Sequence, residues 1–134
     1  MEECHRRGVA VQAYMAIVWD RWAFDHHPAW RARRADGSGM WDDRRNGVCC
    51  VNSGYRDYIL AQIEEVATGY AFEGFRIDME FWPHPCYCDA CRKRYREERG
   101  RELPTVVNWQ DPEWVAFQRA RERWIEEWAE VVLR

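Results

Sequence analysis

Residues 74–82 constrain the fold most, because their side chains alternate between apolar and polar. This period of two predicts a β-strand with two unlike faces. The apolar face carries Phe75, Ile77, Met79 and Phe81, and the polar face carries Arg76, Asp78 and Glu80. The acids lie towards the end of the strand, where parallel α/β sheets place their chemistry. Asp78 is therefore the leading catalytic candidate and Glu80 the second. The alternative is an ion pair of Arg76 with a carboxylate that only holds the strand register.

A second strand is predicted over residues 9–18, whose β-branched and almost uncharged sequence is typical of a parallel strand buried on both faces. Within it, Gln12 and Tyr14 share one face, so Tyr14 is a candidate for contact with a substrate. A helix is predicted over residues 54–70, which carry an apolar stripe at spacings of three and four. The order strand, loop, helix, strand forms a βα unit and favours a parallel sheet.

Residues 19–47 show little periodicity and predict a long loop. Long loops in compact domains are usually functional or disordered, and the aromatic content of this one favours a folded substrate loop. The candidate substrate-binding residues of the loops and strand ends are Trp19, His26, His27, Trp30, Arg76 and Trp82. Each histidine taken alone is more often a surface residue than a ligand. Zinc binding through the adjacent His26 and His27 is not expected, because neighbouring side chains rarely point the same way.

Two further helices are predicted, over residues 89–99 before Gly100 and over residues 112–134 after Asp111. Residues 1–7 are typical of a helix end, so both ends of the chain look cut. Two strands cannot bury helices this aromatic, and a full barrel needs about 250 residues. We expect an α/β fold, a partial (β/α)8 TIM barrel with about two parallel strands, flanking helices and a long aromatic loop. Residues 1–134 would then be part of one catalytic barrel, or a small domain completed by association as a homo-oligomer.

The composition narrows the choice of partners. A net charge of −3, from 23 acidic and 20 basic residues, gives no electrostatic reason to expect nucleic acid or a membrane surface. The chain has no apolar run of about 18 residues and no apolar core of a signal peptide near its first residues. Nine tryptophans favour a carbohydrate site, since their faces stack on sugar rings, although helix–sheet packing also uses them.

Cysteines at positions 86, 88 and 91 crowd three thiols into six residues, which suits a metal ion better than disulfides. Cys86, Cys88 and Cys91 need a fourth ligand for tetrahedral zinc. Cys50 is the expected one, because Cys49 would point the opposite way in an extended chain. Such zinc would be structural, since four thiolates leave no open position. Free or partly oxidised thiols are the alternative. The cysteine usage and the first residues together predict a cytoplasmic location.

These segments together resemble retaining glycoside hydrolases of barrel fold. The residues that carry the resemblance are Cys50-Val51-Asn52-Ser53, Gly74 to Asp78, Cys86-Tyr87-Cys88 with Cys91-Arg92, and Leu103-Pro104. The chain is similar to the α-L-fucosidase-like group across residues 8–19, across His27-Pro28 with Trp30, across residues 58–70, and in the strand ending at Asp78. This resemblance covers most of residues 8–130 and implies that Asp78 is the nucleophile.

The chain also resembles the zinc-containing β-galactosidase group, which shares the arrangement of Cys50 with Cys86, Cys88 and Cys91. That resemblance implies Glu80 as acid/base, although this group has Asn before the glutamate where the chain has Met79. The fucosidase-like match is preferred because it covers more of the chain.

Both resemblances imply an oligosaccharide or glycoside substrate, no cofactor for catalysis, and two carboxyl groups about 5–5.5 Å apart. The partner carboxylate is expected outside these residues, so the chain alone is expected to be inactive. A non-catalytic, zinc-stabilised carbohydrate-binding or interaction module is the alternative from another class.

Overall fold

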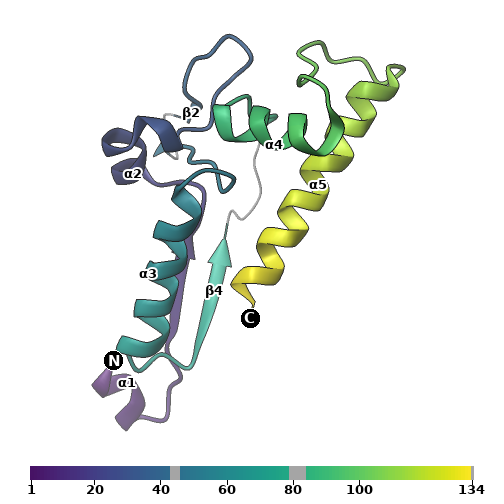
Figure 1. Cartoon of the computed structure of the whole chain (residues 1–134). Helices are drawn as coiled ribbons and strands as arrows, with labels where there is room; N and C mark the ends of the chain where they lie inside the picture. The colour runs from purple at the N-terminus through teal and green to yellow at the C-terminus, as the bar shows by residue number, and fades with distance from the viewer. Residues whose placement is uncertain (43–45, 79–83, 134) are drawn as a thin grey trace.

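The computed structural model describes residues 1–42, 46–78 and 84–133. Helices dominate it, together with two short parallel strands and a minimal antiparallel pair (Figure 1). In chain order the elements are α1 (Glu2–Arg6), β1 (Gln12–Ala16), α2 (Arg21–His26), η1 (Pro28–Trp30), β2 (Trp41–Asp42), β3 (Asn46–Gly47), α3 (Tyr55–Gly69), β4 (Gly74–Asp78), α4 (Asp89–Arg99) and α5 (Pro112–Val132). In the part of the chain that is described, no helix is both long and apolar enough to cross a membrane.

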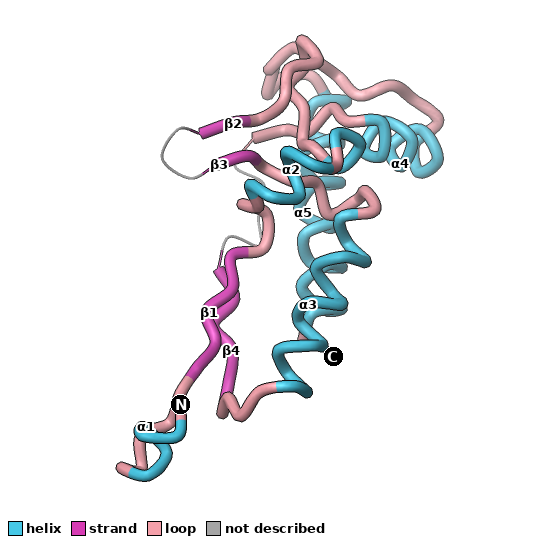
Figure 2. Tube along the Cα trace, turned by 90° about the vertical axis from the view of Figure 1, so that its left-hand side faces the viewer, coloured by secondary structure: helices cyan, strands magenta, loops and turns pink. Residues whose placement is uncertain are grey.

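Strands β1 and β4 lie side by side and run parallel, as the sequence predicted (Figure 2). Gln12 pairs with Gly74 at one end of the register and Ala16 with Asp78 at the other. The backbone N–H of Ile17 donates to the Asp78 carbonyl at 3.0 Å, which continues the ladder past the strand end. The long crossover through α3 is what allows two parallel strands to pair.

Helices cover one face of this small sheet. Phe75 and Ile77 of β4 border the same hollow as Ile63 of α3 and Trp128 of α5. Because side chains alternate along a strand, Arg76 and Asp78 lie on the opposite face. The prediction that β1 is buried on both faces is wrong for the described residues, since Tyr14 is 60% exposed. Ile63 of α3 and Trp128 of α5 lie beside the apolar face of the sheet, whereas Tyr14 lies on the other face.

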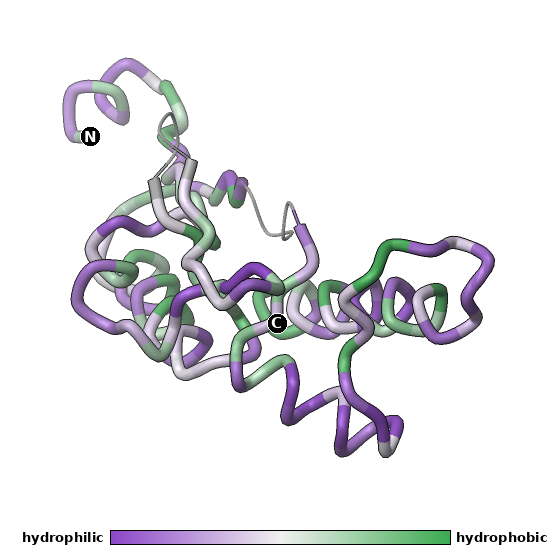
Figure 3. The backbone as a smooth tube through the Cα atoms, turned by 90° about the horizontal axis from the view of Figure 1, so that it is seen from above, coloured by the Kyte–Doolittle hydropathy of each residue, from purple (hydrophilic) through white to green (hydrophobic). Residues whose placement is uncertain are grey.

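Helices α4 and α5 begin and end where the sequence predicted, within two residues. Gly100 ends α4 in the left-handed region at φ 65°, which favours glycine. Asp111 caps α5 by accepting from the Glu113 N–H at 2.9 Å, with Pro112 at the first position. The hydropathy pattern seen from above shows apolar and polar residues alternating along α5 (Figure 3). Its buried side chains are Trp114, Phe117, Ala120, Trp124 and Trp128.

The segment after β1 has more structure than a long loop, so that prediction is wrong in part. It contains α2, η1 and the β2–β3 pair. The Asp20 carboxylate caps α2 by accepting from the Ala23 N–H at 2.8 Å. The ring of Phe24 then packs so closely on Gly47 that a β-carbon there would lie 2.2 Å from it. These elements were missed because each is too short to show a periodicity.

Candidate functional site

The end of β4 presents an acid that is held from the neighbouring strand. The Tyr14 hydroxyl of β1 donates a hydrogen bond to Oδ2 of Asp78. The parallel register sets Tyr14 opposite Arg76, so the phenol reaches diagonally to the acid two residues further along β4. Asp78 is half-buried, and its carboxylate lies on the sheet face away from α3 and α5. A carboxylate fixed in this way has one defined orientation at the carboxyl end of a parallel sheet, where α/β proteins place their sites.

Arg76 lies on the same face and is exposed. Among the ion pairs of the described residues, none joins Arg76 to Asp78. The alternative reading, an arginine–carboxylate pair that holds the strand register, therefore has no support in this part of the chain. Glu80 and Trp82, which the sequence placed beside Asp78, lie outside the described residues.

The predicted aromatic and histidine candidates gather beyond the end of β1. Trp19, three residues after the end of β1, forms an isolated antiparallel bridge with Val48. The rings of His27 and Trp30 stack with their centroids 3.7 Å apart. His26 stacks on Trp22 at 4.7 Å.

Two further aromatic residues of this group were not predicted from the sequence. Tyr58 of α3 lies between the two stacks, with ring centroids 5.8 Å from Trp22 and 5.4 Å from Trp30. Trp22 is 52% exposed. The signal that could have found Tyr58 is its position in the first turn of α3, at the same end of the sheet as the loop after β1. Trp22 belongs to α2, a helix that the sequence did not predict.

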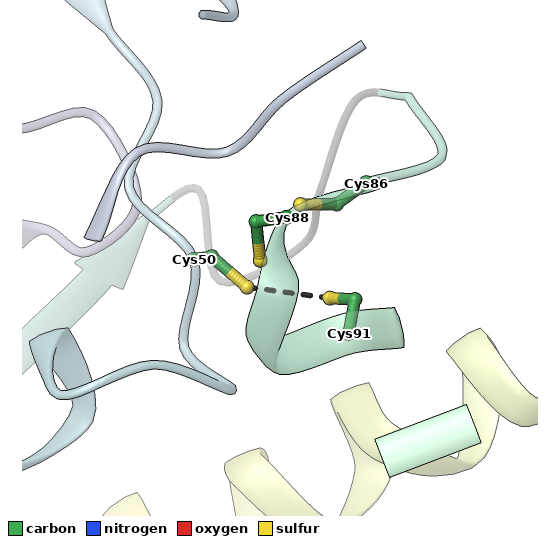
Figure 4. A group of neighbouring side chains, drawn as sticks. All are labelled: Cys50, Cys86, Cys88 and Cys91. Carbon is green, nitrogen blue, oxygen red and sulfur yellow. Dashed lines mark hydrogen bonds between the residues drawn. The ribbon is translucent and has the colours of Figure 1, made fainter. Parts of the chain in front are cut away.

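Four cysteines form a second, separate cluster (Figure 4). The Sγ atoms of Cys50, Cys86, Cys88 and Cys91 all lie within 4.8 Å of one another, and the Cys50 and Cys91 sulfurs are 3.4 Å apart. All four residues are at most 2% exposed. None of them forms a disulfide. The grouping that the sequence predicted is confirmed, and these residues can hold a metal ion.

The geometry also separates the two adjacent cysteines. Cys50 points into the cluster, whereas the Cys49 thiol points away and donates weakly to the Asp20 carbonyl at 3.7 Å. Burial, followed by the nearby Asp20 carboxylate, raises the pKa of Cys49 to about 12, so it stays a thiol. Adjacent residues of an extended segment point to opposite sides, which is why the sequence predicted Cys50 and not Cys49 as the fourth ligand.

The spacing of the sulfurs fits tetrahedral zinc. Zinc–sulfur bonds of about 2.3 Å place tetrahedral sulfurs about 3.8 Å apart, which lies between the 3.4 Å of the Cys50–Cys91 pair and the 4.8 Å limit that holds for all four sulfurs. Cys88 is the N-cap of α4 and Cys91 lies in its first turn, so the positive end of the helix faces the thiolates.

The pKa values of the buried thiols shift in opposite directions. Burial raises the pKa of Cys50 well above its usual value. Hydrogen bonds from Cys50, Cys88 and Cys91 lower that of Cys86. Buried thiols with opposed shifts cannot all ionise unless a cation balances their charge.

Two comparisons with known proteins found a match, one by sequence and one by structure. The sequence model of a family described as hypothetical glycosyl hydrolase 6 matches residues 1–79. Among solved structures, α-L-fucosidase isoenzyme 2 from Paenibacillus thiaminolyticus matches with a TM-score of 0.68 and 22% sequence identity. The match covers 98% of this chain and 20% of that one, so the chain spans about a fifth of its length. At this identity the likeness shows a shared fold. No curated protein matches the chain.

Proposed function

This chain belongs to the hypothetical glycosyl hydrolase 6 family, and we propose that it forms part of the catalytic barrel of a retaining, α-L-fucosidase-like glycoside hydrolase. The observation that carries the proposal is the position of Asp78. Its carboxylate lies at the carboxyl end of a parallel strand, on the face away from the helices, and accepts a hydrogen bond from Tyr14. All of residues 1–134 belong to one such barrel in this proposal.

In the proposed reaction Asp78 attacks the anomeric carbon of the sugar. The bond between that carbon and the leaving oxygen breaks, a carboxylic acid protonates the oxygen, and a glycosyl ester of Asp78 forms. Water then hydrolyses the ester while the acid, now a carboxylate, takes the water's proton. Tyr14 keeps the Asp78 oxygen aimed along the line of attack. The acid/base lies about 5–5.5 Å away in retaining enzymes, and we place it on an element outside these residues.

The substrate in this proposal is a glycoside or oligosaccharide that rests on the face of Tyr14, Arg76 and Asp78. Trp19, His26, His27 and Trp30 lie on the loop and short helices that follow β1, so they would line one side of the sugar. Trp82 is proposed to do the same from the segment after β4. The exposed guanidinium of Arg76 supplies hydrogen-bond donors to sugar hydroxyls.

We also propose that the cysteine cluster binds zinc and that this zinc is structural. Four thiolates complete its coordination, so it offers no position for a water or a substrate. Its effect would be to tie Cys50, in the segment after β1, to the chain that follows β4. Both segments leave the same end of the sheet as Asp78.

The cysteine cluster favours a second candidate, a β-galactosidase-like enzyme with Glu80 as acid/base. This candidate shares the proposed zinc but differs in substrate and in the role of the strand. A non-catalytic, zinc-stabilised carbohydrate-binding module also accounts for the cluster, but leaves the hydrogen bond between Tyr14 and Asp78 without a role. Substrate choice and the effect of replacing Asp78 separate the three.

The test is an assay with aryl α-L-fucoside and aryl β-D-galactoside, made on a protein that carries these residues together with the proposed acid/base, and on the matched fucosidase with the superposed residue replaced. Replacing the nucleophile as in Asp78→Asn should lower kcat by about 10⁴-fold or more, because no covalent intermediate can form. Azide should restore turnover to Asp78→Gly, whose missing side chain leaves room for it, and give a glycosyl azide of inverted configuration. Asp57→Asn, on the exposed first turn of α3, is the matched control. Turnover within a few-fold of wild type after replacement would exclude Asp78 as nucleophile.

A further inference from the structure

Asn52 contacts the cysteine cluster from outside it. It lies two residues after Cys50, in the turn that leads into α3, and its Nδ2 donates to the Cys91 Sγ at 3.4 Å. Among the hydrogen bonds of the described residues, this is the one that a side chain other than cysteine donates to a sulfur of the cluster. Asn52 itself is only half-buried, so its amide reaches inwards from the edge of the site.

Arg94 determines which way this amide faces. Its Nη1 donates to Oδ1 of Asn52 at 2.9 Å. A guanidinium has donors and no acceptor, so the amide oxygen must face Arg94 and the amide nitrogen must face Cys91. The orientation follows from chemistry and does not depend on how the two amide atoms were assigned.

Arg94 is itself held from several sides. Its Nε donates to Glu98 of α4 at 2.8 Å, and its Nη2 donates to Glu127 of α5. Its guanidinium carbon lies 5.0 Å from the centre of the Trp124 ring. An arginine with this many contacts has few rotamers left, so it presents a fixed donor to Asn52. The chain of contacts from Glu127 through Arg94 and Asn52 therefore ends on one sulfur of the cluster.

We infer that Asn52 is the positioning residue of the metal centre, and that its amide orients the Cys91 thiolate for coordination while Arg94 holds the amide. The inference rests on the proposed metal site. Four thiolates around a divalent cation carry a net charge of −2, and the cluster is buried. An N–H donated to a coordinating sulfur disperses part of this charge, and such outer contacts are worth about 10- to 100-fold in metal affinity.

Two variants separate the role towards the metal from a role in holding the fold. Asn52→Asp keeps the oxygen that accepts from Arg94 but places a second, charged oxygen against the sulfur. Asn52→Leu has a similar volume and loses both contacts. Asn108→Asp is the control, because Asn108 is exposed and uses only its Oδ1, which accepts from the Gln110 N–H at 3.0 Å.

The affinity of each metal-free protein is measured by competition with a chromophoric chelator for zinc. Cobalt(II) is titrated in parallel, following the charge-transfer band from sulfur to cobalt. We expect Asn52→Asp to bind zinc about 10- to 100-fold more weakly than wild type and to shift the cobalt band. Circular dichroism of the metal-loaded Asn52→Asp protein should match wild type, since the contact with Arg94 is kept. Asn108→Asp should bind like wild type.

Equal zinc affinity of Asn52→Asp and wild type would overturn the inference, and a loss confined to Asn52→Leu would do the same, because the contact with Arg94 would then be all that matters. A wild-type protein that binds neither zinc nor cobalt would remove the metal proposal and this inference together. None of these outcomes bears on Asp78, whose test is the glycosidase assay.

Discussion

The cysteine cluster and the acidic strand end lie at the same end of the sheet, but they differ in how much of each site the described residues supply. The cluster has four ligands of one chemistry, all at most 2% exposed. The strand end has one half-buried carboxylate and a tyrosine that is 60% exposed. The first is a site whose coordination the chain can complete. The second is a face that still offers room for a substrate or for further protein.

This difference follows from the separation of the contributing residues. Three of the cysteines lie within six residues, at the start of one helix, so local chain geometry alone brings them together. A catalytic face of a barrel gathers side chains from the ends of several strands. The described residues include one parallel pair. The proposed metal centre therefore depends mainly on this chain, and the proposed active site on more strands than this pair.

The largest expected effect comes from removing one proposed ligand of the cluster. Cys50→Ser removes one of four proposed ligands, and we expect it to lose the metal. The free energy of zinc binding to small zinc-dependent domains is about 10–16 kcal/mol. This matches or exceeds the free energy of unfolding of a typical domain, about 5–15 kcal/mol. The variant should lack a cooperative unfolding transition by circular dichroism. Elemental analysis should find about one zinc per wild-type chain and almost none in the variant.

Cys49→Ser is the matched control, since Cys49 is adjacent, equally buried and directed away from the cluster. It should keep the metal and lose only about 1–3 kcal/mol, the cost of burying a hydroxyl. Chelator added to wild type should mimic Cys50→Ser. If the two serine variants lose metal to the same extent, or if metal-free wild type is fully folded, the cluster is not the element that holds this region together.

The sequence predicted the cluster, the parallel pair and the three long helices because each leaves a local pattern. Cysteine spacing, a period of two and a period near 3.6 are properties of neighbouring residues. The α2 helix and the β2–β3 pair leave no such pattern, because six and two residues are too few to show one. Their existence depends instead on contacts such as the Phe24 ring against Gly47, which join residues 23 positions apart.

In the candidate site, too, the sequence predicted only what a local pattern reveals. Strand alternation alone put Asp78 on the face opposite Phe75 and Ile77. The partner of Asp78 was not predictable, because the pairing of Tyr14 with it depends on the register of two strands 62 residues apart. Asn52 lies two residues before Gly54, the N-cap of α3, and no pattern in the sequence marks it as part of the metal site. Its contact with Cys91 depends on Arg94 in another helix, which no local spacing reveals.

A smaller effect is expected from Tyr14→Phe, which tests whether the open strand face works as proposed. The variant keeps the ring and removes the hydrogen bond to Asp78. A hydrogen bond to a charged group is worth about 1.5–3 kcal/mol, so kcat in the glycosidase assay should fall about 10- to 100-fold. Metal content should not change, because the two sites share no residue.

Tyr70→Phe serves as its control, being an exposed tyrosine at the other end of the sheet whose contact is with the ring of Phe72. It should retain full activity. If Tyr14→Phe were as active as this control, Tyr14 would not position the nucleophile. If it lost zinc, the separation between the two sites would be wrong.

The smallest effect is expected from Glu98→Gln, which asks whether surface ion pairs stabilise the region around the cluster. Partial burial raises the pKa of Glu98, but hydrogen bonds from Arg94, Trp124 and Arg123 outweigh it and bring the pKa below its usual value of 4.5. A lowered pKa in the folded state means that the carboxylate adds stability above pH 4.5, and that this contribution is lost as the pH falls through the lowered pKa.

With a side chain that is 27% exposed, Glu98 should contribute less than about 1 kcal/mol to the free energy of unfolding. Urea unfolding of both proteins should therefore show a small deficit in the variant at pH 7 that stays constant down to about pH 4.5 and shrinks as the pH falls further. The comparison is made at each pH at which elemental analysis finds the metal retained in both proteins. A deficit of several kcal/mol, or one that grows on acidification, would mean that the ion pairs and not the sulfurs hold α4 and α5 in place.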